Sequence, residues 1–116
     1  MIFIKYIDKF DFEYDIQGIV RSFYPGEEMC TDKSERLNDA RLILECDFNS
    51  ESLEIKLLEK LNDTQFKPVT IEKFKAATDL NGKYDRKETK NILKRKLYDI
   101  LHNYCLLYTS PSPRDR

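Results

Sequence analysis

Histidine, glycine and cysteine are scarce in this chain, and it contains no long apolar run. Of its 116 residues, three are Gly, three are Cys and one is His. No glycine-rich phosphate loop and no paired-cysteine zinc motif can be found. No stretch approaches the length that spans a bilayer, and the first residues, MIFIKYIDKFDF, lack the basic and apolar regions of a secretory signal. We therefore expect a cytoplasmic protein without a membrane partner.

The charged residues are distributed unevenly. Residues 1–59 contain 7 Lys/Arg and 14 Asp/Glu, a net charge of −7, whereas residues 83–104 contain 7 Lys/Arg and 3 Asp/Glu, a net charge of +4. The whole chain has a net charge of only −1. Because a nucleic-acid-binding domain is usually basic overall, we do not expect nucleic acid as the main partner. The asymmetry indicates either internal charge complementarity or a basic binding surface.

The first half of the chain predicts strands and one helix. Alternation predicts a strand at Met1–Ile7 and a hairpin formed by Ala40–Phe48 and Leu53–Leu57, with one apolar face and one charged face. Tyr14–Phe23 has helical spacing of its apolar residues. The polar stretch Glu27–Asp39 predicts a loop.

The stretch Tyr84–Tyr104 predicts a long amphipathic helix. Asp85 is a favourable N-cap residue, and Glu88 three residues later completes a capping-box pattern. No Gly or Pro interrupts the run. One side carries apolar residues at helical spacing, namely Ile92, Leu93, Leu97, Ile100, Leu101 and Tyr104.

The segment Lys60–Lys83 admits two interpretations. Thr70–Leu80 has the pattern of a short helix, whereas Val69–Phe74 has the pattern of a third hairpin strand. In either case we predict an α+β fold. It has a small, mostly antiparallel sheet, an early helix and a long C-terminal helix, and the two helices cover the apolar face of the hairpin.

A second side of the predicted long helix is basic. This basic ridge consists of Lys87, Lys90, Lys94, Arg95 and Lys96. It is compatible with a solvated surface, with docking against the acidic half or another domain, or with phosphate contacts. The phosphate contacts would need stacking aromatic residues or a helix docked in a groove, and only Tyr84 and Tyr98 flank the ridge.

No residue is assigned a catalytic, cofactor-binding or metal-ligating role from the sequence. The lone His102 is expected at the surface near the helix C-terminus. Cys46 is expected in the core, because free Cys is often buried, and Cys30 lies in the polar loop. The acid pair Glu27-Glu28 is expected to be solvated.

The run DRKETKNILKRKLYDIL, Asp85–Leu101, makes the chain recognisable. It resembles the segment before the catalytic domain of HemZ-type oxygen-independent coproporphyrinogen III oxidases (coproporphyrinogen dehydrogenases), which are radical S-adenosylmethionine enzymes. The run IVRSFYPGEE, Ile19–Glu28, resembles the family's N-terminal region less specifically. The resemblance extends over residues 1–104. In the family this helix leads into a Thr-Gly and a Leu-Pro-Trp-Gly-like segment, whereas here the pattern stops after Tyr104.

The resemblance implies an activity in haem biosynthesis. Such an enzyme oxidatively decarboxylates two propionates of coproporphyrinogen III to give protoporphyrinogen IX without oxygen, although some relatives in the wider superfamily handle haem instead. It implies hydrogen abstraction by a 5′-deoxyadenosyl radical from S-adenosylmethionine, at a [4Fe–4S] cluster on a Cys-x3-Cys-x2-Cys motif. That spacing is absent from this chain. We therefore expect the chain alone to be inactive and to hold no cofactor. Its expected partner is the missing catalytic domain, and porphyrinogen is a substrate of the full-length protein only.

The final residues have a different character. The peptide CLLYTSPSPRD, Cys105–Asp115, matches letter for letter the in-frame translation of a transposase sequencing adaptor. We therefore expect residues 1–104 to be a non-catalytic domain and residues 105–116 to be an adaptor-derived, disordered tail. We also expect Leu93, Leu97 and Leu101 to pack partly on the missing domain, which would leave residues 1–104 only marginally stable. The alternative function is a freestanding α+β module that binds nucleic acid or protein through residues 84–104.

Overall fold

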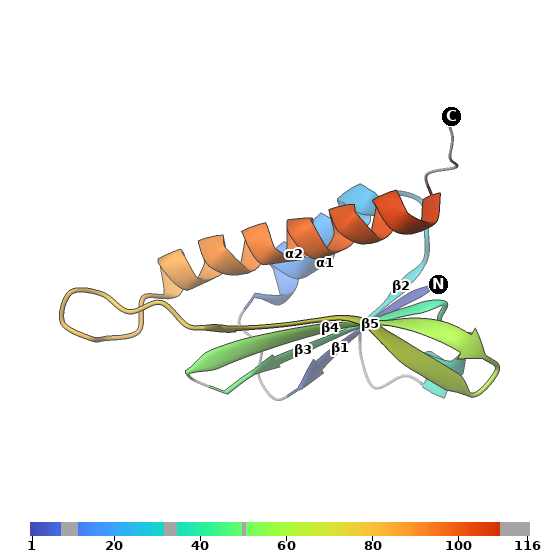
Figure 1. Cartoon of the computed structure of the whole chain (residues 1–116), viewed down its shortest axis with the longest axis horizontal. Helices are drawn as coiled ribbons and strands as arrows, with labels where there is room; N and C mark the ends of the chain where they lie inside the picture. The colour runs from blue at the N-terminus through green and yellow to red at the C-terminus, as the bar shows by residue number, and fades with distance from the viewer. Residues whose placement is uncertain (8–11, 32–34, 50, 110–116) are drawn as a thin grey trace.

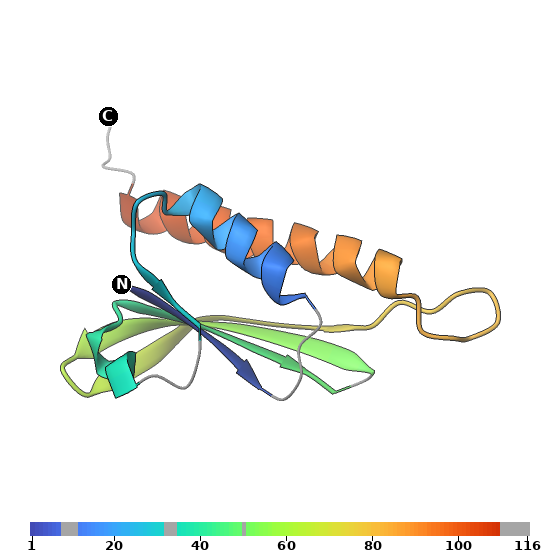
Figure 2. The same cartoon turned by 180° about the vertical axis from the view of Figure 1, so that it is seen from behind.

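The computed structural model describes residues 1–7, 12–31, 35–49 and 51–109. Within these ranges, two α-helices lie side by side over one face of a five-stranded sheet (Figures 1 and 2). The strands are β1 (Ile2–Ile7), β2 (Met29–Cys30), β3 (Leu42–Phe48), β4 (Ser52–Asn62) and β5 (Gln65–Lys75). The helices are α1 (Glu13–Phe23), the 3₁₀ helix η1 (Glu35–Asp39) and α2 (Arg86–Thr109).

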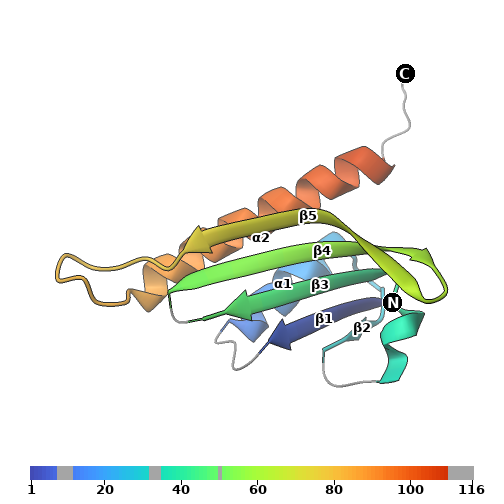
Figure 3. The same cartoon turned by 60° about the horizontal axis from the view of Figure 1, so that its bottom comes forward.

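The sheet has the strand order β2-β1-β3-β4-β5 (Figure 3). Strand β1 runs parallel to β2 and β3, whereas β3–β4 and β4–β5 are antiparallel hairpin pairs. Most of the paired residues belong to these two antiparallel ladders. The prediction of an α+β fold with a mostly antiparallel sheet and an early and a late helix is therefore confirmed. Of the two interpretations of Lys60–Lys83, the strand is correct, because β5 pairs with β4 over most of its length.

The main core lies between the helices and the sheet. Phe12, Ile16 and Val20 of the α1 segment are buried there, and α2 contributes its apolar stripe. Leu93 and Leu97 are 0% exposed and Leu101 is 2% exposed, in one cluster with Leu44 of β3 and Leu57 of β4. The expectation that this stripe packs partly on a missing domain is therefore wrong. The longer, three-stranded meander offers α2 a wider apolar surface than the predicted hairpin alone.

The sequence predicts a charged face on the other side of the sheet. This prediction is only partly correct, because part of that face is apolar and buried. Phe3, Ala40 and Ile43 form a second buried cluster there. Leu37 of η1 and Phe66 of β5 pack against it. The cluster forms because η1 folds over the beginning of β1 and β3, which shields this end from water.

Two further predictions need correction. The expected loop Glu27–Asp39 contains β2 and η1 on either side of residues 32–34, which lie outside the described residues. Two residues of β2 are too few to produce an alternating pattern. They pair in parallel with Ile2 and Phe3 of β1, and just before them Glu28 C=O accepts a hydrogen bond from Ile2 N–H at 2.9 Å. Residues 105–109 are helical, not disordered, because no Gly or Pro stops α2 before Pro111. Residues 110–116 lie outside the described residues.

Candidate functional site

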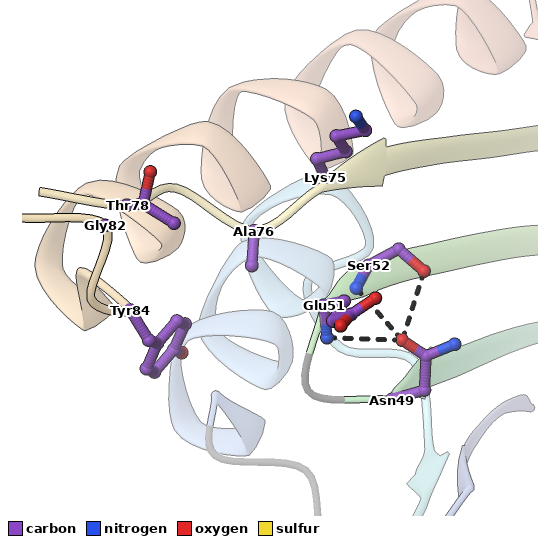
Figure 4. A pocket seen from close by; sticks show the side chains of 8 residues that line it. All are labelled: Asn49, Glu51, Ser52, Lys75, Ala76, Thr78, Gly82 and Tyr84. Atoms are coloured by element: carbon purple, nitrogen blue, oxygen red, sulfur yellow. Dashed lines mark hydrogen bonds between the residues drawn. The ribbon is translucent and has the colours of Figure 1, made fainter.

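A cavity of about 470 Å³ opens at one end of the sheet, between the β3–β4 turn and the connection from β5 to α2 (Figure 4). We call it the end pocket. Its described lining residues are Asn49, Glu51, Ser52, Lys75, Ala76, Thr78, Gly82 and Tyr84. The Asn49 carboxamide oxygen accepts hydrogen bonds from Ser52 N–H at 3.0 Å and from the Ser52 hydroxyl at 3.1 Å. One wall of the pocket is therefore set by a hydrogen-bonded turn.

The other wall is an ordered hairpin, residues 78–84, which projects beyond the sheet (Figure 1). Asp79 N–H donates to Lys83 C=O at 2.7 Å, and Gly82 N–H donates to Asp79 C=O at 3.0 Å. The Asp79 carboxylate accepts from the backbone N–H of Asn81 at 2.8 Å and of Lys83 at 3.0 Å. Gly82 has a φ of 80°, which a residue with a Cβ rarely adopts. These contacts define one turn geometry for the hairpin.

Helix α2 holds the base of this hairpin. The Asp85 carboxylate accepts from Glu88 N–H at 3.0 Å, so the predicted N-cap is confirmed. The Asp85 N–H donates to Ala77 C=O at 2.8 Å, whereas a complete capping box would have Glu88 as its acceptor. The buried Thr89 hydroxyl donates to Asp85 C=O at 2.7 Å and accepts from Ala77 N–H at 2.8 Å. Sequence reasoning missed this role of Thr89, because a lone Thr in a charged run carries no signal of burial.

Aromatic contacts attach the pocket wall to the core. The ring centroid of Tyr84 lies 5.8 Å from that of Phe48, which lies 6.4 Å from that of Phe12. The Arg86 guanidinium lies 5.2 Å from the centre of the Phe12 ring. Tyr84 is 40% exposed, and it therefore offers a supported aromatic surface to the pocket.

The beginnings of β1 and β3 lie at the opposite end of the sheet (Figure 3), and a second polar cluster forms there around Glu27 and Arg41. The Arg41 guanidinium donates to both Glu27 carboxylate oxygens, at 2.5 and 2.6 Å, and the Met1 ammonium donates to Glu27 at 3.2 Å. Hydrogen bonds from Arg41 lower the pKa of Glu27 to about 2, although partial burial opposes this shift. The Arg41 guanidinium also lies 5.2 Å from the Tyr24 ring centre.

Two tyrosines complete this second cluster. The Tyr104 hydroxyl donates to Glu59 at 2.7 Å, and the Tyr24 hydroxyl lies 3.7 Å from the Cys105 sulfur. Burial raises the pKa of both tyrosines, and the hydrogen bond to Glu59 raises that of Tyr104 further. The tyrosines are therefore neutral at physiological pH, and the cluster ties α2 to β4 and to the end of α1.

The basic ridge is partly neutralised inside the molecule. Lys90 pairs with Asp15 of α1 at 3.8 Å, and Arg95 pairs with Glu88 at 4.0 Å. Lys87 is exposed and Lys94 is half-buried. The Lys90–Asp15 contact agrees with the predicted complementarity between the basic helix and the acidic half.

The other residues considered in the sequence differ in their exposure to solvent. His102 is exposed. Cys46 is fully buried, as expected, and burial raises the pKa of its thiol. Cys30 is half-buried beside the second core cluster. Among the described residues, no group of three or more His, Cys, Asp or Glu side chains could hold a metal ion.

The acid pair differs from its prediction. Glu27 and Glu28 are not simply solvated, because Arg41 pairs with Glu27 and Arg36 donates to both oxygens of Glu28, at 2.6 and 2.9 Å. Within the part of the chain that the structure describes, no helix has the length and apolar character needed to cross a membrane. In comparisons with known proteins, no family, no curated protein and no solved structure matches this chain.

Proposed function

We propose that this chain is the non-catalytic N-terminal domain of a HemZ-like coproporphyrinogen dehydrogenase. The proposal rests on the resemblance of Asp85–Leu101, and this segment forms most of α2. Its residues have distinct structural roles: Asp85 caps the helix, Thr89 ties it to the preceding hairpin, and Leu93 and Leu97 are buried in the core. The resemblance therefore concerns a segment that is built into the core and that holds the preceding hairpin, which supports reading it as part of one domain.

In this proposal the catalytic residues belong to a domain encoded after the Tyr104 codon. The full-length protein would convert coproporphyrinogen III to protoporphyrinogen IX with a [4Fe–4S] cluster and S-adenosylmethionine. The domain described here would position and stabilise that catalytic domain. It would contribute no ligand to the cluster.

The decisive experiment is to amplify the source locus across the Tyr104 codon and to sequence it without transposase adaptors. We expect the frame to continue into the Leu-Pro-Trp-Gly-like segment and then a Cys-x3-Cys-x2-Cys motif. The full-length protein, purified without oxygen, should then convert coproporphyrinogen III only when S-adenosylmethionine is present. A genomic frame that encodes CLLYTSPSPRDR and stops would refute the proposal.

The alternative, a nucleic-acid-binding module, has less support from the geometry. Two of the five residues of the basic ridge, Lys90 and Arg95, already have acidic partners within the chain. We expect no salt-sensitive binding of labelled single- or double-stranded oligonucleotides in fluorescence anisotropy. An affinity that falls steeply between 50 and 200 mM salt, on the order of a thousandfold, would indicate several phosphate contacts and would favour the alternative.

A further inference from the structure

We draw no further inference here: the strongest candidate, the end pocket between the β3–β4 turn and the 78–84 hairpin, has one acid, one base and one aromatic ring among its described lining residues, and nothing in the structure shows which ligand or partner this set of groups selects.

Discussion

Glu27 and Glu28 are neighbours in the sequence, yet each pairs with a different arginine. Glu27 lies beside Arg41 at the beginning of β3, and its side chain is 24% exposed. Glu28 lies beside Arg36 of η1, and its side chain is 56% exposed. The more sheltered pair contributes more to stability, because exposed ion pairs are screened by water and salt.

The first prediction concerns the pH dependence of stability. The folded-state pKa of Glu27 is lowered to about 2, below the usual value for Glu near 4.3. Its charged form therefore stabilises the fold above the unfolded-state pKa, and this contribution is lost as the pH falls from about 4 to about 2. Urea unfolding at several pH values should show a smaller acid-induced loss of stability for Glu27→Gln than for the wild type.

Glu28→Gln is the control for this experiment. The pKa of Glu28 is also lowered, mainly by hydrogen bonds from Arg36, but its side chain is more exposed than that of Glu27. We expect its substitution to change the acid dependence less than that of Glu27. Equal pH profiles for the two variants would show that the Arg41 pair has no special role.

At the scale of elements, the beginning of α2 holds together the helix itself, the segment that follows β5 and the 78–84 hairpin. Asp85 caps the helix. The Thr89 hydroxyl accepts a hydrogen bond from the N–H of Ala77, which lies two residues after the end of β5. The hairpin and the end pocket therefore depend on the same helix N-terminus. This dependence explains why the mostly polar segment 77–85 adopts one conformation although it contributes little to the core.

The second prediction follows from this coupling. Asp85→Ala should lower the free energy of unfolding by about 1 kcal/mol, within a range of roughly 0.5–2, because Glu88 N–H loses its acceptor. Lys87→Ala removes an exposed side chain from the same turn and should have a smaller effect. Chemical denaturation of both variants measures the difference. Equal losses of stability would indicate that the cap is not important.

At the scale of the whole molecule, the described chain consists of one helical layer on one sheet (Figures 2 and 3). Among the side chains that the structure describes, every buried residue of the main core lies at or before Tyr104. Residues 105–109 extend α2, and Cys105 adds a contact with Tyr24 at 3.7 Å. Of the two side chains described beyond Tyr104, Cys105 is half-buried and Leu106 is exposed.

The third prediction is that a chain ending at Tyr104 unfolds cooperatively, with a thermal midpoint within a few degrees of that of the whole chain. The reason is that its apolar stripe is already buried against its own sheet. In the same background, Leu97→Ala should cost about 2–5 kcal/mol, because it leaves a cavity in the core. Scanning calorimetry tests both outcomes. A broad, non-cooperative transition of the shortened chain would mean that the core is incomplete without further residues.

Local pattern was sufficient to predict much of this protein. Alternation of apolar residues located β1, β3 and part of β4. Helical spacing of apolar residues located α1, and the N-cap Asp85 located the beginning of α2. These signals are readable because a strand or helix that packs on a core repeats its apolar residues with a fixed period. The α+β class follows from the same periods. The sequence also shows that this chain does not contain the Cys-x3-Cys-x2-Cys spacing of a radical S-adenosylmethionine site.

Only the tertiary structure decided the contacts between distant segments. Residues 65–75 form the strand β5 because β4 provides a long partner for it. The local pattern of residues 60–83 allowed both a helix and a strand, and it could not reveal this partner. The tertiary structure also brought Glu27 to Arg41 and formed the end pocket from the β3–β4 turn and the 78–84 hairpin. The physical reason is that periodicity reports which face of an element is buried, whereas ion pairs and cavities depend on which elements meet, and pairing in the sheet determines that.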